Sequence, residues 1–423
     1  PHINLKSPCA EQDGRIRDFV HVVFKQAGGA PLKYALGDSL MLYPSNDSAA
    51  VDQFLRTNYP DLTSNLVLNV KAGPASKGML EHIPAEATVG DILGSCLDLF
   101  GVPTKRFYKQ LERHATDPKE KQELGLLKKG EGKYKEWANA WGECKTIADV
   151  ITAFPKSRPP FEYLLEMVPQ LQARSYSIAS SPTMHPGEIH LCILPNTWNT
   201  NSGHRFGTAG NFVGNMMKSG DVVRGAIHVS AMQQPDDHSH PQVMVGIGSG
   251  LAPFMAFVQE RAMAAKKGPV APMRLYFGNR FEETEYLYRK ELEGYEKDGW
   301  LTIRTAWTPF APFDIAPGGK FGTEAKVKQF YAEEGKKTGG KVKFSPKYKT
   351  FVQDLVAEDV AELAELLHDK DGYIYCCGNR FMPPEVQKSL QQCFVKGKKI
   401  SAAAAEEKIV DMYIRGRYNV ESW

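Results

Sequence analysis

The sequence predicts an α/β chain in which an antiparallel β-barrel, interrupted by a helical insertion, precedes a doubly wound parallel sheet. Three observations lead to this fold class. Residues 15–43 look like β structure, and β character returns at residue 167. Helical spacing of apolar residues fills the interval 48–166. From residue 242 onward, buried strands alternate with helices, which is the pattern of βαβ units and a parallel sheet.

Length and composition are those of a globular protein with two or three domains. The chain has 423 residues, of which 42% are hydrophobic and 24% charged. Its formal net charge of +3 gives no reason to expect nucleic acid as a partner. No apolar run approaches the length of a membrane span, so we expect none in this chain.

The seven cysteines are scattered and form no C-x-x-C pair. We therefore expect no zinc or iron–sulfur site, and no metal. A reducing compartment follows, either the cytoplasm or the cytosolic face of a membrane reached through a missing N-terminal part. The chain opens at Pro1 without Met or a signal-like segment, which favours a piece of a longer polypeptide.

The first β segment contains two recognisable strands. Residues 17–25 partly alternate between apolar and polar side chains. Residues 34–44 contain a turn at Gly37-Asp38 followed by a short apolar strand. A β-barrel or β-meander begins in this way.

The helical block 48–166 is bounded by strands on both sides, so we expect it to be inserted into the barrel. Ser48 is a candidate cap for a helix over 49–59, and Thr88 for a second helix. The remaining expected helices are 103–115 with His114 on its apolar face, one beginning at Asp117-Pro118, and short ones at 131–141 and 146–154.

The second β segment carries a cation, an aromatic ring and a hydroxyl in close sequence. Arg174 and Tyr176 share one face of a strand, because side chains two residues apart point the same way. An arginine fork suits phosphate and a flat tyrosine suits stacking on a ring system. The alternative is an ordinary strand with one buried tyrosine. Further on, small residues in 207–214 precede a helix and leave backbone N–H groups open to an anion.

Residues 233–241 form a polar linker, and a strand, a glycine turn and a helix follow in 243–254. The Gly246-x-Gly248-x-Gly250 spacing is neither the dinucleotide G-x-G-x-x-G nor a P-loop. Glycines here would let the backbone approach a pyrophosphate, although a plain strand–helix connection is an equal alternative. Later strands are expected at 273–278, 301–307 and 372–378, and helices at 286–297, 351–368, from 383, and at 403–414.

Taken together, these segments resemble the FAD- and NADP(H)-binding module of the diflavin reductase family, of the NADPH–cytochrome P-450 reductase and sulfite reductase flavoprotein type. The resemblance covers nearly the whole chain in order. It rests on the following motifs: Arg174-x-Tyr176-Ser177, Leu191-Cys192-Ile193, residues 207–213, residues 246–254, and Leu-Tyr-Phe-Gly-x-Arg at 275–280. It implies a ferredoxin–NADP reductase-like fold. FAD would then bind the barrel formed by 1–47 and 167–232, the block 48–166 would be the connecting domain, and NAD(P)H would bind 242–423.

The resemblance also implies the residues that contact each cofactor. Arg174 would hold the FAD pyrophosphate and Tyr176 the isoalloxazine. The full FAD set is Arg174, Tyr176, Ser177, Cys192, Ile193, Gly207, Thr208, Ala209, Gly210, Asn211 and Trp423. The NADP(H) set is Gly246, Gly248, Ser249, Gly250, Ala252, Pro253, Arg280, Thr308, Lys349, Phe351, Gln353, Cys377 and Gly378.

By the same resemblance, Ser177, Cys377 and Glu421 would line the hydride-transfer site, and Trp423 would shield the flavin until nicotinamide displaces it. A hydroxyl, a thiol and a carboxylate can orient nicotinamide and stabilise its developing charge. The structural alternatives are a buried core cysteine and a frayed terminal tryptophan.

Several positions depart from the family pattern. The Ser-Arg pair that usually reads the 2′-phosphate is replaced by Thr308-Pro309, and 310–346 is an apparent insertion. Phe351 replaces the usual tyrosine between Lys349 and Gln353. The other departures are Glu421 and Asn379 in place of aspartate, and Met255 where some relatives have arginine. We expect NADPH as donor, with NADH left open.

The expected activity is hydride transfer from NADPH to FAD, then electron transfer to an FMN-binding flavodoxin-like domain or another acceptor. FMN would bind only outside this chain. The acceptors considered are a haem monooxygenase, sulfite reductase, methionine synthase and a fused pyruvate-oxidising module. Two alternatives are a nucleotide-binding docking module without turnover and an FAD oxidase that uses NADH and oxygen.

Overall fold

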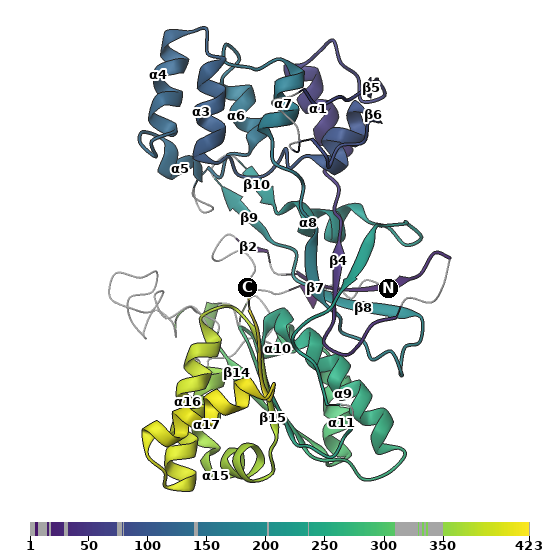
Figure 1. Ribbon diagram of the computed structural model, residues 1–423, viewed down its shortest axis with the longest axis vertical. Coiled ribbons are helices and arrows are strands. Elements are labelled where there is room, and N and C mark those ends of the chain that lie inside the picture. Colours follow the sequence, from purple (N-terminus) through teal and green to yellow (C-terminus); the bar gives the residue numbers. More distant parts are fainter. Residues whose placement is uncertain are drawn as a thin grey trace.

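The protein is arranged as three regions along its longest axis (Figure 1). Helices α1 to α7 lie at one end, antiparallel strands in the middle, and a parallel sheet with its helices at the other end. The computed structural model describes residues 5–6, 15–16, 18–28, 33–73, 78, 80–138, 143–200, 203–235, 237–308, 329, 332–333, 336 and 350–422. Most of 310–346, together with Lys349 and Trp423, therefore lies outside the described residues.

The middle region consists of three antiparallel three-stranded sheets, ordered β1-β3-β8, β10-β9-β2 and β11-β4-β7. An isolated bridge from Ile178 to Leu191 joins β7 to β8. The elements are β1 (Leu5–Lys6), β2 (Arg15–Ile16), β3 (Asp18–Lys25), β4 (Ser39–Leu42), β7 (Arg174–Ser177), β8 (Glu188–Ile193), β9 (Thr197–Thr200), β10 (Gly203–Phe206), β11 (Gly225–His228), α8 (Thr208–Asn211) and a π-helical turn Phe212–Met216.

The sheets β1-β3-β8 and β11-β4-β7 share one apolar core. Alternate residues of β3, β4 and β8 point inward and are buried, because strand side chains alternate between faces. The core residues are Val20, Val22, Leu40, Leu42, Ile178, Ile189, Leu191, Ile193 and Val213. The expectation of an antiparallel FAD-type barrel is therefore confirmed.

The helical region has a core of its own, made by buried residues between Val51 and Val168. Its elements are α1 (Ser48–Asn58), β5 (Val67–Asn69), β6 (Glu86–Thr88), α2 (Val89–Asp91), a π-helical turn Ile92–Cys96, α3 (Lys105–Arg113), α4 (Pro118–Leu127), α5 (Tyr134–Ala138), α6 (Ile147–Ala153) and α7 (Phe161–Met167). Thr88 and Asp117 cap their helices as expected.

Two local predictions in this region were wrong. The cap of α1 is Asp47 and not Ser48, because the Asp47 carboxylate accepts a hydrogen bond from Ala49 N at 2.8 Å. His114 follows the last residue of α3 instead of lying within the helix.

The third region is built on a five-stranded parallel sheet with the order β14-β13-β12-β15-β16. Its strands are β12 (Gln242–Ile247), β13 (Met273–Asn279), β14 (Leu301–Trp307), β15 (Tyr373–Gly378) and β16 (Tyr418–Ser422). The last strand was expected only as a tail. Its sequence alternates apolar Tyr418 and Val420 with polar residues over only five positions, and it forms a strand by pairing with β15 at the edge of the sheet.

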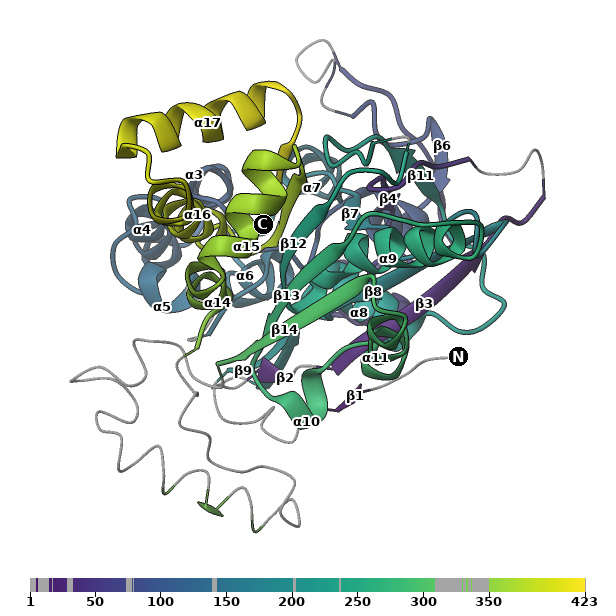
Figure 2. The ribbon, with the colours of Figure 1, turned by 90° about the horizontal axis from the view of Figure 1, so that it is seen from below.

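Helices cover both faces of this sheet, with α9 and α11 on one face and α14 to α17 on the other (Figure 2). Met244 belongs to the apolar core on the α9 face, and Val243 and Val245 to the opposite core, so β12 is buried on both sides. The helices are a 3₁₀ turn Gly248–Leu251, α9 (Ala252–Ala265), α10 (Glu282–Glu285), α11 (Arg289–Lys297), α14 (Val352–Glu358), α15 (Val360–Ala364), a π-helical turn Glu365–Asp369, α16 (Met382–Lys398) and α17 (Ala402–Ile414).

Two predicted helices differ in detail. The helix expected from Tyr286 begins at Arg289, because Tyr288 has φ 54° and its hydroxyl pairs with His21 Nδ1 at 2.8 Å. The helix expected over 351–368 is broken at Asp359. Its carboxylate binds Arg304 at 2.6 Å and Tyr276 at 2.6 Å.

The barrel and the parallel-sheet region are in direct contact. Ser181 N donates to Gln259 Oε1 at 3.0 Å, and Ser181 Oγ donates to Glu260 Oε2 at 2.5 Å. Buried Arg261 donates to the backbone carbonyl of His238 at 2.8 Å and so holds the 233–241 linker against α9. Within the described residues, no helix combines the length and the apolar character that a membrane crossing needs.

Candidate active site

The carboxyl edge of the parallel sheet gathers most of the residues expected to bind nucleotide. In parallel α/β sheets this edge is where ligands bind. Five strands contribute to this edge, in the order β14, β13, β12, β15 and β16. Their carboxyl ends carry Thr308 after β14, Arg280 after β13, the glycine turn 246–250 at β12, Cys377 and Gly378 on β15, and Glu421 on β16.

The glycine turn packs against the end of β15. A Cβ at Gly250 would lie 2.2 Å from the Cys377 carbonyl oxygen, and one at Gly246 would lie 2.9 Å from the Phe254 ring. Gly248 has φ 56°, a left-handed conformation that glycine adopts readily. Ser249 stays partly exposed, whereas Ala252 and Pro253 are buried at the start of α9. Close packing therefore requires glycine at both positions, at Gly250 against Cys377 and at Gly246 against Phe254.

Ser177, Cys377 and Glu421 converge although they lie far apart in the sequence. Ser177 Oγ donates to Glu421 Oε2 at 3.0 Å. Cys377 lies opposite Glu421 in the β15–β16 register. The structure thus brings together three of the four residues expected at the hydride-transfer site, from the barrel and from two neighbouring strands of the sheet.

Burial sets the protonation of this cluster. Desolvation raises the pKa of the Glu421 carboxyl, while hydrogen bonds from Ser177 and Ser39 oppose the shift. Burial first, and the charge of Glu421 second, raise the pKa of the Cys377 thiol well above its ordinary value. At neutral pH the Cys377 thiol is therefore protonated.

Sequence reasoning missed Ser39 and His228. Ser39 Oγ donates to Glu421 Oε1 at 3.5 Å, and Ser39 pairs with Ser177 on one side and with His228 on the other. The charge of His228 lowers the pKa of Glu421. Ser39 and His228 are identified by the strand register, which sets the residues that lie opposite each other in neighbouring strands. No local sequence motif specifies that register.

The barrel side presents a cation and a ring on strand β7. Arg174 is exposed, and its Nη1 donates to the backbone carbonyl of Gln172 at 2.8 Å. Tyr176 is half-buried opposite Leu40, and burial raises its pKa to about 12, so its ring is a neutral phenol. Arg174 and Tyr176 lie on the same strand, β7, which ends at Ser177.

The second expected flavin segment begins helix α8. Gly207 is its N-cap, and Thr208, Ala209, Gly210 and Asn211 form its single turn. The first N–H groups of a helix lack intrahelical partners, as an anion-binding turn requires. Gly210 is needed for packing, since a Cβ there would lie 2.8 Å from Asn196 N.

Cys192 and Ile193 take a different position from the other expected FAD residues. Both side chains are buried in hydrophobic cores, Cys192 against the parallel-sheet region and Ile193 inside the barrel. Burial raises the pKa of Cys192 to about 12. Their side chains therefore pack within the protein.

The expected 2′-phosphate residues lie at the β13–β14 end of the edge. Thr308 N donates to Asn279 O at 2.9 Å, and Thr308 Oγ1 donates to Thr350 O at 2.8 Å. This second bond ties together the two ends of the interval 309–349. Phe351 and Gln353 begin α14 just beyond it, both half-buried.

Two departures from the family pattern have packing explanations. Met255 is fully buried in the core beneath α9, a position where an arginine charge would be desolvated. Asn379 Oδ1 accepts a hydrogen bond from Phe381 N at 3.0 Å and shapes the turn between β15 and α16.

These features fit FAD and a nicotinamide nucleotide. An exposed guanidinium and a half-buried ring share one strand, and a left-handed glycine turn meets a protonated thiol at the sheet edge. A carboxylate whose pKa is raised by burial faces the same point. Such perturbed groups concentrate at functional sites.

Comparisons with known proteins agree with this geometry. The FAD binding domain family matches residues 8–212, and the oxidoreductase NAD-binding domain family matches residues 244–341. The chain is similar to the NADP(+) pyruvate dehydrogenase of Euglena gracilis, a protein named as mitochondrial, with 38% identity over 96% of this chain and 20% of that protein. The NADP(+) pyruvate dehydrogenase of Cryptosporidium parvum is 32% identical over 96% of this chain and 21% of that protein.

NADPH–cytochrome P450 reductase of Bos taurus is 29% identical over 93% of this chain and 54% of its own length. The chain thus spans 20% to 54% of the length of these relatives. The two family matches lie in the expected order along the chain and on the two regions that meet at Ser177, Cys377 and Glu421. The chain therefore belongs to the diflavin reductase family, as an oxidoreductase module with an FAD binding domain and an NAD-binding domain.

Proposed function

We propose that this chain transfers a hydride from NADPH to FAD and passes the electrons to an FMN-binding flavodoxin-like domain or another redox partner. One observation carries the proposal. Ser177, Cys377 and Glu421 meet where the FAD-type barrel faces the ends of two strands of the NAD-type sheet. A reaction between two cofactors requires such a junction, because the protein must hold both reacting rings in one place.

Each residue has a role that its surroundings support. FAD, when bound, supplies the redox chemistry. Arg174 would hold its pyrophosphate and Tyr176 would pack on its ring. The Glu421 carboxylate would stabilise the positive charge that develops on nicotinamide as hydride leaves. Ser177, at 3.0 Å, keeps that carboxylate oriented.

Cys377 and Trp423 complete the assignment. The Cys377 thiol remains protonated and would position the nicotinamide through its S–H group and its small size. Trp423 would cover the flavin and move aside for nicotinamide. We further propose the domain boundaries 1–47 with 167–232, 48–166, and 242–423, joined by the 233–241 linker.

NADPH is the proposed donor on two grounds. The relatives named above carry NADP(+) or NADPH in their names. The end of the sheet edge that carries Arg280, Thr308, Phe351 and Gln353 is where the adenosine 2′-phosphate would bind. Arg304 is not a candidate for this role, because Glu358 and Asp359 both bind it at 2.6 Å.

The partner is proposed from the longer relatives. An FMN domain is one possibility, and the NADP(+) pyruvate dehydrogenases favour a fused pyruvate-oxidising module as another. With that module, the same site would deliver hydride to NADP+. We place the reaction in a reducing compartment, in keeping with the free thiols of the six cysteines that the structure describes.

Ferricyanide reduction with NADPH and with NADH tests the proposal, together with anaerobic bleaching of bound flavin. We expect bound FAD, bleaching by NADPH, and faster ferricyanide reduction with NADPH. Protein that takes up no FAD would refute the flavoenzyme assignment. Bound FAD without turnover from either donor would support a docking module, and peroxide formed in proportion to NADH consumed would support an oxidase.

A further inference from the structure

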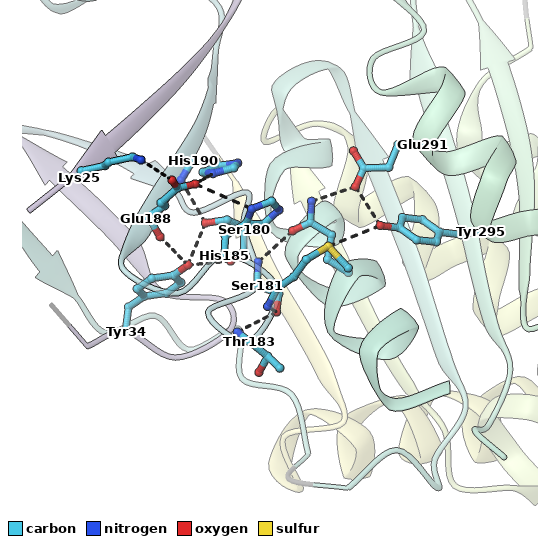
Figure 3. A network of polar contacts seen from close by, with 12 residues as sticks. Lys25, Tyr34, Ser180, Ser181, Thr183, His185, Glu188, His190, Glu291 and Tyr295 are labelled. Atoms are coloured by element: carbon cyan, nitrogen blue, oxygen red, sulfur yellow. Dashed lines mark hydrogen bonds and ion pairs between the residues drawn. The ribbon is translucent and has the colours of Figure 1, made fainter. Parts of the chain in front are cut away.

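A second cluster of titratable side chains lies on the connection between β7 and β8, outside the proposed hydride site. It consists of His185, Glu188 and His190, all on the barrel (Figure 3). In sequence they form His-x-x-Glu-x-His, a pattern without cysteine that a search for C-x-x-C pairs does not detect.

The backbone brings the three side chains together. Glu188 N donates to His185 O at 3.2 Å across a turn in which Gly187 has φ 77°. Glu188 and His190 are two residues apart in β8 and therefore share one face of the strand. His185 N is in turn held by Ser181 O at 2.9 Å. The arrangement thus depends on a tight turn and a strand, and not on flexible side chains alone.

The distances suit a metal ion. Glu188 Oε2 lies 3.0 Å from His190 Nε2 and 3.9 Å from His185 Nδ1. All three ligand atoms lie within 4.8 Å of one another. Two ligand atoms bound to one tetrahedral zinc ion at its usual bond lengths are about 3.4 Å apart. The measured distances fall on either side of that value, so small side-chain rotations would close the site.

The surroundings leave these ligand atoms available and orient them. Lys25 Nζ binds Glu188 Oε1 at 2.9 Å, which leaves Oε2 facing the two histidines. Tyr34 Oη donates to the Glu188 carbonyl at 3.0 Å, and Ser180 Oγ accepts from His190 N at 3.0 Å. The side chains of His185 and Glu188 are 28% and 27% exposed, so an ion and a water ligand have access.

We infer that His185, Glu188 and His190 bind one divalent ion of the zinc class, with water as the fourth ligand. Two imidazoles and one carboxylate favour Zn²⁺ and its neighbours Co²⁺, Ni²⁺ and Cu²⁺ over Mg²⁺ and Ca²⁺, which prefer oxygen ligands alone. Three protein ligands with one open position are a usual zinc arrangement.

The site has a structural consequence. The turn that carries His185 also carries Ser181, whose hydroxyl donates to Glu260 of α9, and Met184, whose Sδ lies 3.7 Å from Tyr295 Oη of α11. A bound ion would fix this turn in its docked conformation. It would thereby stabilise the contact between the barrel and the parallel-sheet region.

Zinc binding to the FAD-loaded chain after chelator treatment tests the inference, by calorimetric titration with ZnCl₂ and by the absorption spectrum of the Co²⁺ form. We expect one ion per chain, a tetrahedral Co²⁺ spectrum without thiolate charge-transfer bands, and a higher Tm with zinc. His185→Ala, Glu188→Gln and His190→Ala should each weaken binding at least about tenfold, since even outer-shell partners change metal affinity by 10- to 100-fold.

His368→Ala is the matched control. His368 Nδ1 lies 3.1 Å from Asp369, so it is a histidine–carboxylate pair, but it belongs to no three-residue cluster of this kind among the described residues. Its zinc titration should equal that of the parent chain. His185 is partly exposed, so His185→Ala should fold, and FAD content and circular dichroism verify this. No stoichiometric binding, unchanged binding in both histidine variants, or thiolate bands in the Co²⁺ spectrum would each overturn the inference.

Discussion

Replacing Glu421 by glutamine removes the charge of the proposed hydride site without changing the size of the side chain. The carboxylate accepts hydrogen bonds from Ser177 at 3.0 Å and from Ser39 at 3.5 Å. Glutamine keeps one acceptor oxygen and replaces the other by NH₂, which cannot accept a bond from the second hydroxyl. The variant therefore loses its charge and the orienting contact on one side.

The expected loss follows from the strength of charged hydrogen bonds. Such a bond contributes about 1.5–3 kcal/mol, and each 1.36 kcal/mol changes a rate tenfold. Hydride transfer should therefore slow by roughly 10- to 160-fold. Because the positive charge on nicotinamide develops only as hydride leaves, the effect should fall on the rate of flavin reduction and leave NADPH affinity nearly unchanged.

Anaerobic stopped-flow measurement of flavin bleaching by NADPH gives this rate, and NADPH deuterated at the transferred position shows whether hydride transfer limits it. Glu407→Gln changes an exposed carboxylate of α17 and serves as the charge control. Glu421→Asp restores the charge and should recover part of the rate. If Glu421→Gln bound FAD fully and reduced it at the parent rate, the assigned role of this carboxylate would be refuted.

Three further predictions concern the hydride site, the glycine turn and the linker. Flavin reduction should slow as pH falls through the raised pKa of Glu421, and the pH profile of Glu421→Gln should be flat in that range. Because the pKa of Glu421 is raised in the folded protein, the contribution of this carboxyl to stability is greatest at low pH and is lost as pH rises through that pKa. Gly250→Ala should lower the free energy of unfolding in urea by about 1–3 kcal/mol and weaken NADPH binding, because its Cβ would lie 2.2 Å from the Cys377 carbonyl oxygen. Gly294→Ala is the control, since a Cβ there meets open space and should not destabilise the chain. Arg261→Met should cost about 1–3 kcal/mol in the same assay, because buried linker carbonyls lose their donor; an unchanged unfolding midpoint would contradict this.

Local patterns were sufficient where structure depends on near neighbours. The buried strand, glycine turn and helix around Gly246–Pro253 were predictable, because apolar runs, glycine and proline each restrict the backbone locally. The strand carrying Arg174 and Tyr176 was predictable for the same reason. Strand β16 and the break at Asp359 were not, because pairing at a sheet edge and a distant arginine pair decide them.

By itself, the sequence determined the order of the elements, the family motifs and the residue types available for hydride chemistry. Only the tertiary structure decided which of those residues meet. Ser39 joins Glu421 through strand register, Cys192 is withdrawn into a core, and His185, Glu188 and His190 gather at one turn. The physical reason is that register and packing depend on contacts between segments far apart in the chain. A pattern of near neighbours carries no information about those contacts.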